Sequence, residues 1–198
     1  ESIQKVFDDC IILTLSAIQL TIKSQTKFFN NVVLFKPDVI INAAAYTVVD
    51  KAESEPEIAT DVNCIGSLNL AIAAKEVGAR LIHVSTDYVF DGSGNVPYLE
   101  SDPVNPLGVY GQTKLAGELL VRSILPDAII VRTAWVFSEF GNNFVKTMLR
   151  LGAERSELGI VSDQFGCPTY AGDIASAIFS FLDINAPGGN SPYCWIQS

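Results

Sequence analysis

Residues 38–85 decide the fold, and they read DVIINAAAYTVVDKAESEPEIATDVNCIGSLNLAIAAKEVGARLIHVS. The segment begins with a short apolar run at 38–42 and ends with a second one at 80–85. Between them, residues 54–77 carry apolar side chains three or four positions apart, and Gly78 follows. Short apolar runs bounded by turn residues are typical of buried strands, and the intervening spacing is typical of a helix that glycine ends. The segment therefore predicts a strand–helix–strand unit with two parallel strands.

The same alternation continues toward the C-terminus. A loop rich in Gly, Asn and Pro occupies 91–106, and a third apolar run, AIIVR, lies at 128–132. The other expected elements are helices over 24–35, 109–125, 142–154 and 173–182 and a short strand over 158–161. The tail, 186–198, is turn-rich and predicts no regular element. This order predicts an α/β fold: a Rossmann-like, doubly wound parallel sheet with helices on both faces.

The composition is that of a globular domain. The chain has 198 residues, of which 48% are hydrophobic and 18% charged, enough to fill a core and too apolar for a disordered or fibrous chain. The net charge of −9 makes a nucleic-acid surface or adhesion to an anionic membrane unfavourable. The most apolar N-terminal run, 10–22, is shorter than the roughly 20 residues of a membrane span, and the acidic pair before it does not fit a signal peptide.

The cysteines give no sign of a metal or disulfide framework. None of Cys10, Cys64, Cys167 and Cys194 forms a C-x-x-C pair, and the single His83 does not complete a usual zinc set. We therefore expect buried thiols, no metal, and a cytoplasmic protein in a reducing compartment.

Residues that follow the predicted strands are the first candidates for chemistry, because ligands of open parallel sheets sit beyond the carboxyl ends of the strands. Three alanines, 43–45, follow the first strand, and such small residues permit either close approach of a ligand or tight strand–helix packing. Ser85 and Thr86 end the second strand. Their hydroxyls can donate to a substrate oxygen, although a capping role for Thr86 and Asp87 is equally open.

Tyr110 and Lys114 are four residues apart in a predicted helix and so share one face. A lysine ammonium beside a phenol lowers the pKa of the phenol, and such a tyrosine can exchange protons near neutral pH. Of the six tyrosines only Tyr110 has a lysine at this spacing. A solvated lysine beside a half-buried tyrosine is the alternative that the spacing alone leaves open.

Several stretches together resemble a known group of enzymes. The segments 42–47 (NAAAYT), 85–92 (STDYVFDG) and 110–114 (YGQTK) resemble the extended short-chain dehydrogenase/reductases. The resemblance narrows to the dTDP-4-dehydrorhamnose reductases over about residues 35–182. Its further motifs are 50–57 (DKAESEPE), 114–118 (KLAGE), 132–136 (RTAWV), 141–150 (GNNFVKTMLR) and 163–169 (DQFGCPT).

The resemblance implies an oxidoreductase of dTDP-rhamnose biosynthesis. In that family NADPH or NADH reduces the C4 ketone of dTDP-4-dehydro-L-rhamnose, a nucleotide sugar, to dTDP-L-rhamnose. Carried over residue by residue, the implied catalytic residues are Thr86, Tyr110 and Lys114. The implied cofactor-binding residues are Ala45, Tyr46, Thr47, Asn63, Tyr110 and Lys114. The implied substrate-binding residues are Thr86, Asp87, Trp135, Asn142, Asn143 and Gln164.

Some of these residues also have ordinary structural interpretations. Trp135 could be a core aromatic at a strand end, and Asn142 or Asn143 could cap a helix. The resemblance further implies an incomplete NAD(P)-binding region at 1–135, interleaved with a partial substrate-binding region at 136–198. A homodimer is a possible assembly.

The chain departs from the family pattern in its phosphate loop. A dinucleotide-binding fold uses a glycine-rich turn after its first strand, whereas the first glycine here is Gly66. We therefore expect the usual first βα unit to be missing and cofactor binding to be weak. Three lost charge-assisted hydrogen bonds of roughly 1.5–3 kcal/mol each correspond to about three decades in affinity or more.

Two other functions stay open at this point. A non-catalytic binding relative, such as one resembling the regulatory subunit of methionine adenosyltransferase, would keep the scaffold without the phosphate loop. A sugar-nucleotide epimerase would share the tyrosine and lysine, although the segments 50–56 and 141–150 fit the reductases better. The sequence leaves the choice between NADH and NADPH open, because the strand end that discriminates them is not recognisable.

Overall fold

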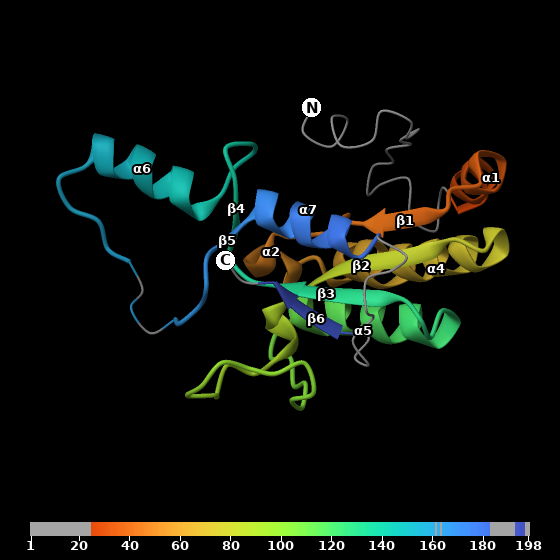
Figure 1. The fold of residues 1–198 in the computed structure, drawn as a ribbon. Helices are drawn as coiled ribbons and strands as arrows, with labels where there is room; N and C mark the ends of the chain where they lie inside the picture. The colour runs from red at the N-terminus through yellow and green to blue at the C-terminus, as the bar shows by residue number, and fades with distance from the viewer. Residues whose placement is uncertain (1–24, 161, 163, 183–192, 197–198) are drawn as a thin grey trace.

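The computed structural model describes residues 25–160, 162, 164–182 and 193–196. At its centre is a four-stranded parallel sheet in the order β1-β2-β3-β6. Its strands are β1 (Val39–Asn42), β2 (Arg80–Thr86), β3 (Ile129–Thr133) and β6 (Tyr193–Ile196). All carboxyl ends point the same way, toward the left in Figure 1. The predicted parallel arrangement of the first three strands is confirmed.

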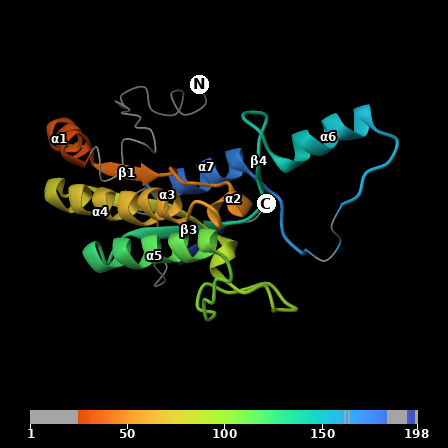
Figure 2. The ribbon, with the colours of Figure 1, turned by 180° about the vertical axis from the view of Figure 1, so that it is seen from behind.

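Helices cover both faces of this sheet, as the alternation predicts. On one face lie α4 (Gly66–Val77) and α5 (Val109–Ile124), and on the other lies α7 (Ala171–Ser180) (Figure 2). Successive residues of β2 point to opposite faces: Leu81 packs with α4 and α5, and Ile82 packs with α7. The remaining helix of this layer, α1 (Gln25–Phe35), packs against α4 through Val32. The fold is thus the Rossmann-like α/β arrangement that the sequence predicts.

The helix expected over 54–77 begins with the short α3 (Pro56–Thr60), and a further short helix, α2 (Val49–Ala52), precedes it. A π-helical turn at Asp61–Ile65 connects α3 to α4, and Gly78, at φ +73°, ends α4. The buried side of this helix differs from the expected apolar series, since Ile58 is 50% exposed. Small or polar residues such as Asn63, Ser67 and Ala74 are buried instead. They are small because the helix packs against the sheet and, alongside it on the same face, against α5.

Two expectations about the C-terminal third are wrong. Residues 158–160 form no strand; instead β4 (Val136–Phe137) pairs with β5 (Thr169–Tyr170) in a separate two-stranded sheet. The tail was expected to hold no element, yet residues 193–196 form β6 beside β3. Both pairings join residues far apart in sequence, which local patterns do not reveal.

The remaining helix is α6 (Phe144–Glu154), which stands off beyond the carboxyl ends of the strands (Figure 1). The apolar run 10–22 and Cys10 lie outside the described residues. Within the residues that are described, the helices are too short or too polar to cross a bilayer.

Helix α5 lies directly against the π-helical turn Asp61–Ile65 and the start of α4 at Gly117. A Cβ atom there would overlap the carbonyl oxygen of Asn63 and would also press on the Ser67 hydroxyl. Close backbone approach is the reason that glycine occupies this position.

We expect Gly117→Ala to destabilise the fold by about 1–3 kcal/mol, because the added methyl group forces the two helices apart. Gly152→Ala is the matched control: Gly152 is also helical, and its Cβ would meet no atom within 4 Å. Alanine there should be neutral or stabilise by up to about 1 kcal/mol. Urea unfolding of both variants measures the difference, and equal stabilities would contradict the close-packing argument.

Candidate active site

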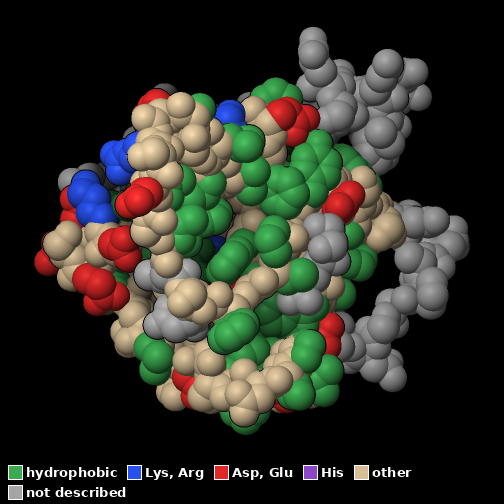
Figure 3. All heavy atoms as spheres, turned by 90° about the vertical axis from the view of Figure 1, so that its left-hand side faces the viewer, with side chains coloured by type: hydrophobic (Ala, Val, Ile, Leu, Met, Phe, Trp, Pro, Cys, Tyr) green, Lys and Arg blue, Asp and Glu red, His purple; other side chains and the backbone are tan. Residues whose placement is uncertain are grey.

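A cavity of about 980 Å³ opens at the carboxyl ends of the strands. Figure 3 looks onto this end of the molecule, where many hydrophobic side chains gather around a central hollow. The polar and aromatic residues of its wall include Thr47, Ser85, Thr86, Asp87, Tyr88, Tyr110, Lys114, Thr133, Trp135 and Gln164. The expectation that Ala45, Thr86 and Trp135, each from the end of a different strand, face one cavity is confirmed.

Helix α5 is held at its first turn by the segment that follows β1. The backbone N–H of Val109 donates to the Glu53 carboxylate at 2.7 Å. A carboxylate at a helix N-terminus is favourable because the N–H groups there have no partners within the helix. Gly111 lets this turn lie directly against the carbonyl of Tyr88, which a Cβ would overlap. The helix is therefore fixed beside the turn after β2.

Tyr110 lies on this first turn with its ring almost buried, at 9% exposure. Its ring meets the ring of Tyr88 edge-on, with the centroids 5.4 Å apart. Burial raises the pKa of Tyr110 to about 12, although a hydrogen bond with Thr86 acts in the opposite direction. Tyr110 is thus a neutral phenol near pH 7 and still has a proton to donate.

Lys114 lies one turn further along, 2% exposed, and its ammonium donates to the carbonyl of Val84 at 2.7 Å. Burial lowers the pKa of Lys114 to about 8, while the nearby Glu118 carboxylate raises it. The expectation of a lowered pKa for Tyr110 is wrong for this structure, because removal of the phenol from water raises its pKa and outweighs the hydrogen bond with Thr86. The expected placement of both side chains in the cavity wall is confirmed.

Thr86 both caps a short helical turn and lies in the wall of the cavity. Its hydroxyl donates to the Asp87 carboxylate at 3.0 Å and accepts from the backbone N–H of Tyr88 at 3.2 Å. It thereby caps the short 3-10 turn Asp87–Val89 and lies in the cavity wall beside Tyr110. Burial raises the pKa of Asp87, whereas the bond from Thr86 lowers it.

The expected cofactor residues divide into two groups. Ala45 and Thr47 lie in the cavity wall. Asn63 is fully buried behind them, accepting from the N–H of Tyr46 at 2.8 Å and donating to its carbonyl at 3.2 Å. The Tyr46 hydroxyl binds the Glu55 carboxylate. Asn63 therefore shapes the loop after β1, and as far as the described residues define the cavity, neither it nor Tyr46 belongs to its wall.

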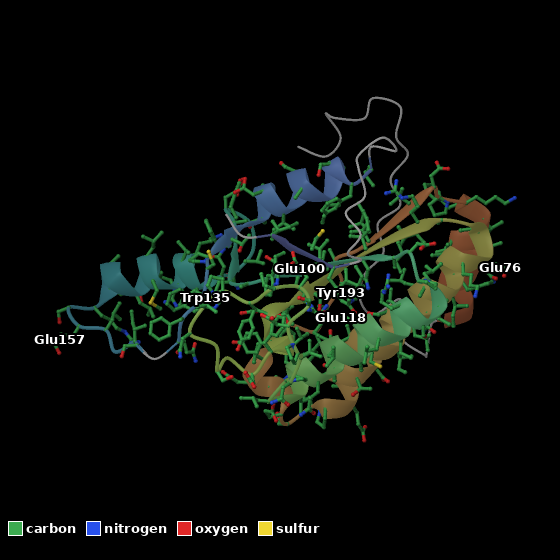
Figure 4. The ribbon with its side chains drawn as sticks, turned by 60° about the horizontal axis from the view of Figure 1, so that its bottom comes forward. Glu76, Glu100, Glu118, Trp135, Glu157 and Tyr193 are labelled. Atoms are coloured by element: carbon green, nitrogen blue, oxygen red, sulfur yellow. The ribbon has the colours of Figure 1, made fainter. Side chains whose placement is uncertain are left out.

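Among the expected substrate residues, Trp135 and Gln164 line the cavity, together with Asp87. Trp135 has φ +44°, a left-handed conformation that bulky residues rarely adopt, and its indole faces Phe144 at a centroid distance of 6.3 Å. Gly166 passes directly over the indole, where a Cβ would collide with the ring. Trp135 is half-exposed beside α6 (Figure 4) and is therefore not a core aromatic.

The two asparagines at the start of α6 behave differently from Trp135. Asn143 is the N-cap: its side chain accepts from the N–H of Lys146 at 3.0 Å and donates to the carbonyl of Ser138 at 2.7 Å. The capping interpretation is thus confirmed for Asn143. Asn142 is exposed, and within the described part of the chain the cavity wall includes neither residue.

Tyr88 is one of the cavity residues that were not singled out from the sequence. Tyr88 is partly exposed, lines the cavity and supports the ring of Tyr110. Its position two residues after Thr86, in the same strand-end segment, is the signal that could have identified it. The described residues contain no cluster of three His, Cys, Asp or Glu side chains that could hold a metal ion.

The cavity wall meets part of what a nicotinamide cofactor requires. The alanines after β1 permit close approach, Lys114 supplies a cation, and the buried hydroxyl of Ser85 has no protein partner among the described residues. A parallel Rossmann-like sheet with this threonine, tyrosine and lysine arrangement defines the extended short-chain dehydrogenase/reductase class.

Comparison with known proteins narrows this class. The model of the RmlD substrate binding domain family matches residues 5–190. The chain is 50% identical over 172 residues to dTDP-4-dehydrorhamnose reductase of Aggregatibacter actinomycetemcomitans, covering 87% of this chain and 58% of that protein. It is 57% identical over 136 residues to the Escherichia coli (strain K12) protein of the same name, covering 69% of this chain and 46% of that protein.

A solved structure agrees. The dTDP-4-dehydrorhamnose reductase of Bacillus anthracis, in complex with NADP, aligns with a TM-score of 0.88 at 38% identity, covering 96% of this chain and 67% of that one. The chain belongs to the RmlD substrate binding domain family. It spans about half the length of the two sequence relatives named above.

The buried ammonium of Lys114 generates a prediction about stability and pH. Its pKa falls from 10.5 to about 8 on burial, so the unfolded chain binds this proton more tightly than the folded chain. This group therefore opposes folding below about pH 8, and its unfavourable contribution fades as the pH rises from about 8 to about 10.

Lys114→Met removes that contribution. The free energy of unfolding of the variant should exceed that of the wild type by a larger amount near pH 7 than near pH 9. Urea unfolding at both pH values gives the comparison. Lys75→Met, which removes an exposed lysine of α4, is the control. A variant-minus-wild-type difference that is independent of pH would argue against a buried, titrating Lys114.

Proposed function

We propose that this protein is an NADPH- or NADH-dependent reductase that converts the C4 ketone of dTDP-4-dehydro-L-rhamnose to the alcohol of dTDP-L-rhamnose. The observation that carries the proposal is the meeting of Thr86, Tyr110 and Lys114 in the wall of one cavity. The name shared by relatives 50% and 57% identical to the chain supports this reaction over a regulatory relative or an epimerase.

Tyr110 is the proton donor of the proposed reaction. A bound nicotinamide cofactor supplies the hydride to the carbonyl carbon, and the Tyr110 hydroxyl gives its proton to the carbonyl oxygen. Its pKa of about 12 keeps this proton in place until charge develops on that oxygen. The Thr86 hydroxyl lies beside Tyr110 and donates its one proton to the Asp87 carboxylate. On substrate binding it turns that proton from Asp87 to the carbonyl oxygen and polarises it.

Lys114 stabilises the phenolate that Tyr110 becomes after the proton transfer. Loss of the proton makes Tyr110 a phenolate, and an ammonium one helical turn away offsets that charge in a buried setting. Lys114 also serves as a ligand for the cofactor ribose. On the cofactor side we assign Ala45, Tyr46 and Thr47 as the loop that the cofactor follows. Asn63 holds this loop by two hydrogen bonds.

The substrate side uses residues from both parts of the chain. Asp87 and Trp135 contact the sugar, and Gln164 lies toward the nucleotide, with Asn142 and Asn143 at the edge of that region. This assignment corresponds to a cofactor region at 1–135 interleaved with a substrate region at 136–198. Among the described residues, the thiols of Cys64 and Cys194 are free, which supports a cytoplasmic setting, and we propose a homodimer as the assembly.

The absence of glycine before Gly66 predicts weak cofactor binding by this polypeptide. Fluorescence or calorimetric titration with NADPH should give a dissociation constant well above the micromolar range, with no measurable turnover of the keto-sugar. The net charge of −9 adds to this, since the ligand is an anion. Micromolar affinity would mean that this chain holds the pyrophosphate by a different arrangement.

The chemistry itself is tested in a chimera, in which this chain replaces the matching 172-residue region of the Aggregatibacter actinomycetemcomitans reductase. The chimera should oxidise NADPH when dTDP-4-dehydro-L-rhamnose is added. Tyr110→Phe should lower kcat by about 10²–10⁴ with a smaller change in KM, because it removes proton donation in the transition state. Tyr98→Phe removes a hydroxyl that binds Asp91 in the 91–106 loop and is the control.

Two outcomes would count against the proposed function. A folded chimera that binds NADPH but is inert toward the keto-sugar would favour the non-catalytic relative. An unchanged kcat in Tyr110→Phe would show that this tyrosine is not the acid.

A further inference from the structure

Helix α5 carries a buried charge that the proposed chemistry does not use. Glu118 is 0% exposed and Arg132, on β3, is 2% exposed. The two form a two-pronged ion pair, with Nε to Oε1 at 3.1 Å and Nη2 to Oε2 at 2.7 Å. Replacing such a pair with well-packed apolar residues is often neutral or stabilising, so stability alone is a weak explanation for it.

The pair lies where α5, the sheet and the loop after the Thr86 turn meet. The Arg132 guanidinium is 4.4 Å from the ring centroid of Tyr193 and 5.2 Å from that of Phe90. Its Nη1 also donates to the carbonyl of Glu100. Figure 4 labels Glu118, Tyr193 and Glu100 around this junction. Arg132 is thus held on several sides and in turn fixes the Glu118 carboxylate.

Glu118 is also one helical turn beyond Lys114, on the same face of α5. Three titratable groups surround Lys114: Tyr110 and Glu118 on its own helix and His83 on β2. Arg132 on β3 joins this set because it pairs with Glu118. Burial, with a contribution from the Lys114 charge, lowers the pKa of His83 well below its ordinary value, so this imidazole is neutral. Tyr110 is neutral as well. Glu118 is therefore the carboxylate in this set.

We propose that the Glu118–Arg132 pair is a positioning element for the candidate catalytic lysine: Glu118 holds the positive charge on Lys114, and Arg132 holds Glu118 in place. Without the carboxylate, the buried Lys114 and Arg132 would both lose a counter-charge, and the pKa of Lys114 would fall further. The phenolate formed at Tyr110 would then lack its counter-charge. This catalytic meaning rests on the proposed function, whereas the charge coupling stands independently of it.

The coupling is measured on this chain without cofactor or substrate. NMR of lysines labelled with ¹³C at Cε follows each ammonium through its titration, and the signal lost in Lys114→Met identifies Lys114. Its pKa should be about 8 in the wild type and should fall by about one unit or more in Glu118→Gln. A folded Glu118→Gln protein with an unchanged Lys114 pKa would overturn the proposal.

Glu76→Gln is the matched control, because it makes the same change in charge at an exposed position of α4, far from the pair in Figure 4. It should leave the Lys114 pKa where it is, and a fall as large as that in Glu118→Gln would overturn the proposal as a general charge effect. Glu118→Asp, which keeps the carboxylate, should restore most of the wild-type value.

A second variant covers the case in which Glu118→Gln, with Arg132 left without its carboxylate, does not fold. The double variant Glu118→Gln/Arg132→Gln replaces the ion pair with a neutral pair of similar size and should still lower the Lys114 pKa, because the Glu118 carboxylate is the group that raises it. An unchanged value there would equally overturn the inference. The titration needs no turnover, so the two proposals are tested separately. An unchanged Lys114 pKa would contradict the charge coupling but not the proposed reductase activity. An inactive chimera would contradict the reductase activity but not the charge coupling.

Discussion

The close approach of helix α5 to its neighbours is the constraint on which the candidate site depends. Gly117 lets α5 touch the backbone of the preceding helix, and Gly111 lets its first turn touch the carbonyl of Tyr88. Glu53 closes the N-terminus of the helix from a segment more than fifty residues earlier. These contacts leave α5 little freedom to slide or rotate. Tyr110, which also packs against Ala52 and Ala59, and Lys114 are therefore held beside Thr86.

Burial at this helix governs the chemistry. Removal from water raises the pKa of Tyr110 and lowers that of Lys114, so both groups are displaced toward their neutral forms. In the proposed reaction a neutral phenol suits proton donation, whereas the lysine must stay charged to stabilise the phenolate that follows. The buried Glu118 carboxylate raises the pKa of Lys114 and so favours its charged form. Arg132 forms an ion pair with that carboxylate and compensates its charge. The site thus combines a dry environment with one fixed ion pair.

Much of the fold could be predicted, since parallel strands with intervening helices bring their carboxyl ends to one edge. Ala45, Thr86 and Trp135 consequently meet in one cavity, as expected. The role of a site residue was predicted less well where that role depends on which group the side chain hydrogen-bonds. Asn63 holds a backbone loop instead of lining the cavity, and Asn143 caps α6. An asparagine amide satisfies the backbone or a ligand equally well, so its residue type does not distinguish the two roles.

By itself the sequence determined the strand–helix alternation, the end of α4 at Gly78 and the spacing that places Tyr110 and Lys114 on one helical face. These follow from the local geometry of the backbone, which neighbouring residues specify. Only the tertiary structure decided the direction of the pKa of Tyr110, the strand β6 beside β3 and the left-handed backbone of Trp135. Each of these depends on atoms from segments distant in the chain, because burial, strand pairing and steric contact arise only when those segments pack together.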